Sequence, residues 1–275
     1  VDSALVYRGM DIGSAKPAKE EQKGILHHLI DIREPWQTYS AADFAKEALP
    51  LMQQLSRLNK IPLLVGGTGL YFRALLDGLS DMPAADEEIR SEIQAQAQLQ
   101  GWPAMHEKLK KIDEAAGIRI KPNDVQRITR ALEVFQQTGK PISEWQQNSS
   151  RKRFPFRVLR LCIAPKDRAI LHDRIARRFD LMLAQGFLQE MQTLMANPDV
   201  DSDLPSMRAV GYRQAWRHLN GETSVEQFRE EAIAATRQLA KRQLTWFRGE
   251  LDLRWFDPQI EKTKINEALS LFITR

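Results

Sequence analysis

The sequence predicts an α/β fold in which a parallel sheet is interrupted by a helical insertion. The first observation is the short apolar run at residues 61–65, which ends in a glycine turn and lies between two helical patterns. The second is the stretch 79–150, which carries helical patterns and no strand-like run. Helix, strand, turn and helix in this order are typical of a parallel α/β sheet. We therefore expect a core formed by residues 1–78 and 151–275 and an inserted helical domain formed by residues 79–150.

The core elements follow from local patterns. Ser40 is expected to cap a helix over residues 41–58, because the apolar side chains of Phe44, Leu49, Met52 and Leu55 recur at near-helical spacing. Residues 61–65 are expected to form a buried strand, and residues 70–76 the helix after the glycine turn. A second strand is predicted at 158–164 and a late one at 253–256, with helices elsewhere in the second half.

The inserted domain begins after Gly78. Asn123 is predicted to cap a helix in which Val125, Ile128, Leu132 and Phe135 face inward. Arg127 and Arg130 lie on another face of that helix, so residues 126–130 are expected to form a basic polar surface. The polar stretch 146–153 is predicted to be the linker that returns the chain to the core.

Composition excludes several classes of protein. The 275 residues are 43% hydrophobic and 28% charged, which is ordinary for a globular protein with a sizeable core. No apolar run approaches the roughly 18 residues of a membrane span, and no signal-like stretch opens the chain. The single cysteine, Cys162, excludes an internal disulfide and a Cys-based zinc site. We expect a cytoplasmic protein that does not contact membranes. The net charge of +4 permits a nucleic-acid partner without proving one.

Two short segments carry candidate chemistry. Asp2 is expected where a strand would deliver its carboxyl end, the edge at which open α/β sheets place ligands. Its carboxylate suits a general base or a group that orients a metal-bound water, and equally the cap of a turn. The turn Gly66-Gly67-Thr68 lets backbone approach a ligand and presents a hydroxyl at a helix N-terminus, which favours a phosphate site. Many strand-to-helix turns also contain two glycines.

Two further segments are basic. Arg208 and Arg213 follow Pro205, where they suit a pyrophosphate or an RNA backbone, although surface salt bridges are a commoner role for arginine. In residues 236–248, helical spacing places one polar basic stripe beside an apolar one. The polar stripe consists of Arg237, Lys241, Thr245 and Arg248, and the apolar stripe of Ala240, Leu244 and Phe247. Such a helix is suited to track a phosphate backbone, and a merely solvated face is the alternative.

The histidines do not indicate a metal site. His27 and His28 are adjacent, so they do not share a helix or strand face, and only Asp31 lies near them as a further ligand. The remaining histidines are scattered and lack partners in the sequence. We assign no catalytic role and no metal to any of them.

Taken together, several segments resemble the bacterial tRNA dimethylallyltransferases, also called isopentenyl-diphosphate:tRNA isopentenyltransferases. They occur in the family's order and span nearly the whole chain, so the joint match is far more specific than any one motif. The matching segments are Asp2–Pro17, His27–Asp31, Leu64–Tyr71, Asn123–Arg127, Arg208–Gln214 and Lys241–Arg248.

The resemblance implies a P-loop NTPase-like parallel sheet core with an inserted all-helical domain that clasps the tRNA anticodon stem-loop. It implies transfer of a dimethylallyl group from dimethylallyl diphosphate to N6 of the adenosine 3′-adjacent to the anticodon, giving N6-dimethylallyladenosine. Mg²⁺ is the expected cofactor, bound mainly through the diphosphate and the phosphate loop. The expected enzyme is a nucleotide-binding, ATP-binding prenyltransferase that works in tRNA processing as a monomer.

The resemblance also assigns residues. Asp2 would hydrogen-bond and deprotonate the attacking amine, and Thr68 and Arg208 would hold the diphosphate. An exocyclic amine is a poor nucleophile, so a positioned carboxylate and a stabilised leaving group make chemical sense. The positions expected to contact tRNA or substrate are Asp2, Ser3, Ala4, Leu5, Thr68, Arg90, Gln126, Arg127, Ile128, Thr129, Arg130, Arg208, Ala209, Val210, Gly211, Tyr212, Arg213, Lys241, Arg242, Gln243, Leu244, Thr245, Trp246, Phe247 and Arg248.

One departure concerns the phosphate loop. The family's Gly-x-x-x-x-Gly-Lys-Ser/Thr motif does not occur in the sequence. We expect it upstream of Asp2 in a longer chain, and diphosphate and Mg²⁺ binding would be crippled without it.

Three other functions stay open. An adenylate dimethylallyltransferase performs the same chemistry on a free nucleotide, but extended basic surfaces favour RNA. A P-loop kinase of small molecules would need its own nucleotide site and acceptor hydroxyl. An inactive RNA-binding protein would bind tRNA in a salt-dependent way without prenyl transfer.

Overall fold

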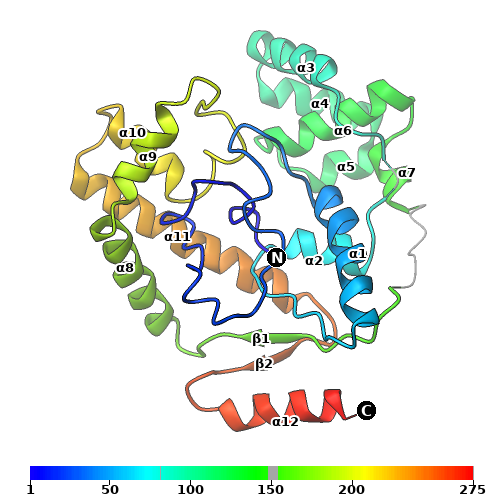
Figure 1. Cartoon of the computed structure of the whole chain (residues 1–275). Coiled ribbons are helices and arrows are strands. Elements are labelled where there is room, and N and C mark those ends of the chain that lie inside the picture. Colours follow the sequence, from blue (N-terminus) through cyan, green and yellow to red (C-terminus); the bar gives the residue numbers. More distant parts are fainter. Residues whose placement is uncertain (81, 148–153, 275) are drawn as a thin grey trace. The chain divides into compact units, whose positions relative to one another are not determined.

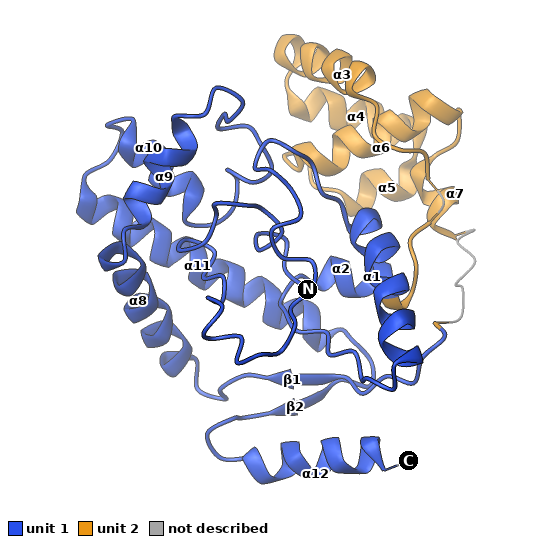
Figure 2. Cartoon of the chain, viewed as in Figure 1, with its two compact units in different colours: residues 1–75, 155–275 blue, residues 76–154 orange. Residues whose placement is uncertain are grey.

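The computed structural model describes residues 1–80, 82–147 and 154–274. The chain divides into two compact units (Figure 2). Unit 1 comprises residues 1–75 and 155–275, and unit 2 comprises residues 76–154. The helices and strands of each unit are labelled in Figure 1.

Unit 1 contains a two-stranded parallel sheet. Strand β1 (Leu161–Ile163) pairs with β2 (Arg254–Phe256), with Cys162 opposite Trp255. Both strands fall inside predicted segments, and the parallel pairing is confirmed, although β1 starts at Leu161 rather than Val158. Helix α12 (Lys262–Ile273) follows β2 along the chain and contacts it (Figure 1).

The remaining helices of unit 1 are α1 (Ala41–Arg57), α2 (Gly69–Leu76), α8 (Arg168–Ala184), α9 (Phe187–Met195), α10 (Tyr212–Leu219) and α11 (Val225–Arg248). Four of them, α8 to α11, pack around an aromatic core. Phe187, Tyr212 and Phe228 are fully buried, and the rings of Phe187 and Tyr212 lie 5.2 Å apart, edge to face. This cluster fixes α9, α10 and α11 against one another. In the part of the chain that the structure describes, no helix is both long and apolar enough to cross a membrane.

The first forty residues form loops that are anchored by charged side chains. The Glu190 carboxylate on α9 accepts the backbone N–H groups of Asp11, Ile12 and Gly13 at 2.6–3.1 Å. It also accepts the Tyr212 hydroxyl at 2.6 Å. A single carboxylate therefore holds this loop onto α9 and α10.

Unit 2 is helical throughout its described elements. These are α3 (Glu87–Gln100), α4 (Trp102–Ile112), α5 (Glu114–Arg119), α6 (Val125–Thr138) and α7 (Ile142–Gln147). Ile93, Met105, Leu109 and Ile128 are almost completely buried in its core. The apolar spacing in the sequence is sufficient to produce this bundle, because each helix needs only one apolar face.

The buried strand expected at residues 61–65 is not formed. Ile61, Leu63 and Val65 are 60%, 80% and 68% exposed. Among the described residues no neighbouring strand forms a ladder with this extended segment. The prediction was wrong because an apolar run becomes a strand only where a partner satisfies its backbone groups.

Two details of the insertion also differ from expectation. The cap of α6 is Asp124 rather than Asn123, since the Asp124 carboxylate accepts the Arg127 N–H at 3.2 Å. Val125 is 41% exposed, because it lies in the first turn at the end of the packed face. The predicted linker begins inside α7, which ends at Gln147, and residues 148–153 lie outside the described residues.

Candidate functional site

Asp2 closes a turn with one carboxylate oxygen. Its Oδ1 accepts the N–H groups of Ala4 at 2.8 Å and Leu5 at 3.3 Å. Among the described residues, no hydrogen bond engages its Oδ2. Asp2 therefore caps a turn, the structural role that its sequence allowed, and keeps one oxygen free to accept a proton or a hydrogen bond.

Thr68 lies directly beside this turn. Its Oγ1 accepts the Ser3 N–H at 3.2 Å and lies 3.4 Å from the Ser3 Oγ. The Thr68 N–H points to the Val1 carbonyl oxygen at 3.4 Å. These contacts bracket Asp2 on both sides, so the structure brings together two residues that are far apart in sequence. Thr68 also precedes α2, whose free N–H groups favour an anion.

Tyr71 of α2 is buried and lies close enough to Asp2 to interact with its charge. Burial raises the pKa of the Tyr71 hydroxyl, and the charges of its neighbours, Asp2 among them, raise the pKa further. The hydroxyl therefore stays protonated and donates to the Tyr39 carbonyl oxygen at 3.2 Å. Sequence reasoning did not single out Tyr71, although its place in the segment after the glycine turn was available as a signal.

Side chains of helix α11 contact the glycine turn Gly66-Gly67-Thr68. Gln243 donates from Nε2 to the Gly67 carbonyl oxygen at 3.1 Å. A Cβ atom on Gly67 would lie 2.2 Å from the same nitrogen, and one on Gly69 would lie 2.4 Å from the Trp246 indole nitrogen. A side chain at Gly69 would clash with the rigid Trp246 ring, and one at Gly67 would push aside the end of the flexible Gln243 side chain. We expected Gln243 and Trp246 to contact tRNA, but the structure shows that both side chains contact the glycine turn.

The outer face of α11 is basic and exposed. Arg237, Lys241, Arg242, Thr245 and Arg248 are all exposed, whereas Ala240, Leu244 and Phe247 are partly buried. The Phe247 ring packs edge to face on Phe72 at 6.3 Å. The two stripes predicted from helical spacing are thus confirmed, and we call the exposed stripe of Arg237, Lys241, Thr245 and Arg248 the basic stripe.

Arg208 lies on a loop that is held in place by the two residues before it. The Ser206 hydroxyl donates to the Pro35 carbonyl oxygen at 2.6 Å, and Met207 is buried. The Arg208 side chain is exposed and lies 3.5 Å from Asp203. Within the described ranges, no hydrogen bond or ion pair joins Arg208 to Asp2 or Thr68.

The other residues of segment 208–213 divide by burial. Arg213 is exposed, while Ala209 and Val210 are partly buried. Gly211 and Tyr212, which were expected at the tRNA surface, are buried, and the Tyr212 hydroxyl is taken by Glu190. Burial raises the pKa of Tyr212, as do the charge of Glu190 and its hydrogen bond. Tyr212 is a core residue because its ring completes the aromatic cluster of unit 1.

In unit 2 a buried carboxylate organises the expected RNA-facing arginines. Glu133 is fully buried and accepts Arg90 Nε at 3.0 Å, Arg130 Nη1 at 2.8 Å and the Asp86 N–H at 2.7 Å. Burial alone would raise the pKa of Glu133, but these hydrogen bonds and the two positive charges lower it. Arg90 and Arg130 are therefore half-exposed partners of a buried charge.

The rest of segment 126–130 is mixed. Gln126 and Arg127 are exposed, and Arg127 lies 3.3 Å from Asp124. The Thr129 hydroxyl donates to the Val125 carbonyl oxygen at 2.8 Å. Ile128 is fully buried in the core of unit 2 rather than at an RNA surface, because it faces the other helices of the bundle.

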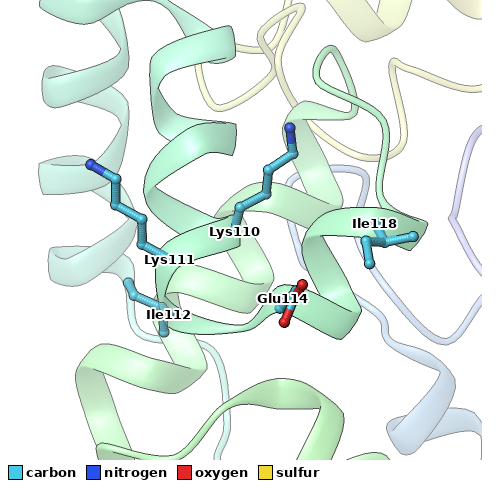
Figure 3. A pocket seen from close by; sticks show the side chains of 5 residues that line it. All are labelled: Lys110, Lys111, Ile112, Glu114 and Ile118. Carbon is cyan, nitrogen blue, oxygen red and sulfur yellow. The ribbon is translucent and has the colours of Figure 1, made fainter.

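Each unit contains a cavity. The one in unit 2 has a volume of about 500 Å³ and is lined by side chains of α4 and α5 (Figure 3). Its labelled side chains are Lys110, Lys111, Ile112, Glu114 and Ile118, and it holds no predicted site residue. The cavity in unit 1 has a volume of about 240 Å³ and reaches Leu244 and Arg248 of α11. Among the described residues, no group of three or more His, Cys, Asp or Glu side chains could hold a metal.

Comparison with known proteins gives consistent results. Residues 5–250 match the family model for IPP transferase. A tRNA dimethylallyltransferase of Stenotrophomonas maltophilia is 56% identical over 280 residues, covering 100% of this chain and 88% of that protein. A tRNA dimethylallyltransferase of Xanthomonas campestris is 54% identical over 278 residues, covering 99% of this chain and 85% of that protein.

Solved structures are similar as well. The full-length tRNA isopentenylpyrophosphate transferase of Bacillus halodurans has a TM-score of 0.69 and 37% identity, covering 99% of this chain and 85% of that one. A eukaryotic dimethylallyltransferase acting on tRNA has a TM-score of 0.73 and 25% identity, covering 93% of this chain and 66% of that one. With a family model matching most of its length and close relatives over nearly all of it, the chain belongs to the IPP transferase family.

Proposed function

We infer that this chain is a tRNA dimethylallyltransferase, and we propose that it modifies N6 of the adenosine 3′-adjacent to the anticodon. The family match and the names of its relatives support prenyl transfer to tRNA. The observation that carries the chemistry is the juxtaposition of Asp2 and Thr68 through the Ser3 contact.

The proposed reaction is a displacement at C1 of dimethylallyl diphosphate. The N6 nitrogen forms a bond to C1, the bond between C1 and the diphosphate oxygen breaks, and diphosphate leaves. The proton released from N6 passes to the free Oδ2 of Asp2. Because the other oxygen is held by two N–H groups, the carboxylate is fixed in orientation before substrate arrives.

Thr68 is proposed to hold the diphosphate. Its hydroxyl lies at the start of α2, whose unsatisfied N–H groups add positive potential. Arg208 is proposed to approach the diphosphate from its exposed loop position. Mg²⁺, when bound, would neutralise diphosphate charge, and the Thr68 hydroxyl is a protein oxygen that suits it, while Asp2 Oδ2 stays free for the proton. Mg²⁺ commonly uses few protein oxygens and takes the rest from phosphate and water.

The RNA is proposed to lie along the basic stripe of α11 and against the exposed Arg127 of unit 2. Phosphate contacts of this kind set position and affinity rather than sequence preference. We further propose that unit 1 is a P-loop NTPase-like core, that unit 2 clasps the anticodon stem-loop, and that the enzyme works as a cytoplasmic monomer.

The test is transfer of labelled dimethylallyl from its diphosphate, with Mg²⁺, to unmodified tRNA and separately to AMP. The key variant is Asp2→Asn, because asparagine keeps the oxygen that closes the turn but is not a base. Asp199→Asn is the matched control at an exposed site. Transfer to tRNA alone, at least about 100-fold slower in Asp2→Asn and unchanged in the control, is expected.

Other outcomes have distinct meanings. Transfer to AMP instead of tRNA would make the enzyme an adenylate dimethylallyltransferase. Salt-dependent tRNA binding without any transfer would leave an RNA-binding protein. An Asp2→Asn variant as fast as the parent would remove Asp2 from the chemistry and leave it as a turn cap.

A further inference from the structure

The cavity of unit 1 lies where the two parallel strands end. Its lining residues come from the segment immediately after β1, from the end of β2 and the residue that follows it, and from the last turns of α11. Carboxyl ends of parallel strands are where open α/β sheets bind ligands. Its volume is about 240 Å³, and it is lined by Ala164, Pro165, Lys166, Arg168, Leu244, Arg248, Trp255, Phe256 and Asp257.

Two positively charged side chains that line this cavity have no carboxylate partner among the described residues. Asp257 is buried, and its carboxylate accepts the N–H groups of Lys166 and Gln259, both at 2.9 Å. The Lys166 ammonium lies 3.5 Å from Glu261. Arg168 and Arg248 are exposed, and neither forms a salt bridge with a carboxylate of the described residues. The cavity rim is therefore suited to an anion such as a phosphate.

The wall of the cavity is suited to a flat ring. Trp255 is 38% exposed, and Leu244 and Phe256 are partly buried beside it. Exposed indole rings bind nucleobases by stacking whatever the base, because every base has a π face. The cavity therefore combines an aromatic side chain, which suits the base of a nucleotide, with two unpaired guanidinium groups, which suit its phosphate.

The basic stripe leads to this cavity. Arg248 is both the last residue of the stripe and part of the cavity lining. Leu244 and Arg248 are one helical turn apart and face the cavity, whereas Gln243 and Trp246 contact the glycine turn. The cavity thus shares no lining residue with the Asp2 and Thr68 site, and an RNA backbone along the stripe would reach it.

We propose that this cavity holds one unpaired nucleotide of the bound RNA, with its base on Trp255 and its phosphate between Arg168 and Arg248. The inference rests on the proposed function, since it assumes that RNA follows α11. It adds a second nucleotide site outside the place where the reacting adenosine binds.

The test measures binding of an anticodon stem-loop RNA at several salt concentrations. Trp255→Leu and Arg168→Ala are each expected to weaken binding roughly 10-fold. Arg168→Ala should also reduce the slope of log affinity against log salt by about one. Trp255→Phe retains an aromatic ring and should bind nearly as the parent does. Arg57→Ala, an exposed cation at the end of α1, is the matched control and should change nothing.

A direct readout is crosslinking of the parent to the same RNA carrying a photoreactive uridine at each unpaired position in turn. At least one position should crosslink to the peptide that contains Trp255, and the yield of that crosslink should fall in Arg168→Ala. Because Arg168 is exposed, Arg168→Ala tests the site even if Trp255→Leu weakens folding.

The opposite results are equally specific. Unchanged RNA affinity and salt slope in both variants would refute the proposal. AMP binding that depends on Trp255, with unchanged RNA affinity, would instead assign the cavity to a free nucleotide. Both differ from failure of the proposed function, in which the parent itself transfers no dimethylallyl group to tRNA.

Discussion

A methyl group added at Gly67 tests whether α11 holds the candidate site in place. The Cβ of Gly67→Ala would lie 2.2 Å from Gln243 Nε2 and 3.0 Å from its Cδ. Ordinary contacts of this kind are about 3.5–4.0 Å, so Gln243 has to move by more than about 1 Å. That movement breaks its hydrogen bond to the Gly67 carbonyl oxygen, now 3.1 Å long.

The expected cost has two parts. The end of the Gln243 side chain can rotate away, so overpacking costs only about 1 kcal/mol, and the lost hydrogen bond costs about 1 kcal/mol more. A total of roughly 2 kcal/mol predicts a fall in melting temperature of about 4–8 °C for a unit of this size. Since Thr68 is the next residue, a shift of the turn after loss of the Gln243 hydrogen bond is expected to slow transfer, and a shift of about 1 Å would slow it roughly 100-fold.

The assay is a double-mutant cycle in thermal unfolding, with Gly67→Ala, Gln243→Ala and the double variant. Gln243→Ala alone loses the hydrogen bond without a clash, so it should cost only about 1 kcal/mol. The double variant should be more stable than Gly67→Ala, because the added methyl then has room. If Gly67→Ala is as stable as the parent, or if the two changes are simply additive, the close packing of α11 on the turn is refuted.

Three further predictions concern charge. Glu133→Gln should destabilise unit 2 by about 2–3 kcal/mol in urea unfolding. Breaking a fully buried ion pair costs roughly 3–5 kcal/mol, and we expect less here because the Arg90 and Arg130 side chains are 37% and 29% exposed. An unchanged urea midpoint would contradict the role of Glu133. Lys241→Ala should lower the slope of log tRNA affinity against log salt by about one, whereas Lys19→Ala, at another exposed position, should leave that slope unchanged. If Lys241→Ala and the parent have the same slope, the basic stripe does not contact RNA. Hydrogen bonds from Asp257 and Lys264 lower the pKa of Glu261 to about 2 from 4.5, so its stabilising contribution is present above pH 4.5 and is lost as the pH falls toward 2. The stability difference between the parent and Glu261→Gln should shrink over that range in acid titrations followed by circular dichroism, and a constant difference would contradict this origin.

Local sequence patterns were sufficient to predict most helices. The Ser40 cap, the helix after the glycine turn and the two stripes of α11 match the structure, because caps and 3.6-residue spacing act within one or two turns. The order of the motifs was also sufficient to identify the family, since their joint spacing is far more specific than any one of them.

Partners distant in sequence were not predictable in this way. Residues 61–65 have the composition of a buried strand, yet they remain exposed without a ladder partner. Tyr212 looks like an ordinary member of a basic segment, and only packing assigns it to a core, whereas the inward position of Ile128 followed from helical spacing. Arg90 and Arg130 are paired because α3 and α6 bring them to the same buried carboxylate.

By itself, then, the sequence determined the helices, the family and the residue types available for chemistry. The tertiary structure decided which of them meet: Asp2 with Thr68, Gln243 with Gly67, and Trp255 with Arg168 and Arg248 in one cavity. The physical reason is that capping and periodicity are local interactions, whereas burial and charge pairing depend on contacts between segments far apart in the chain.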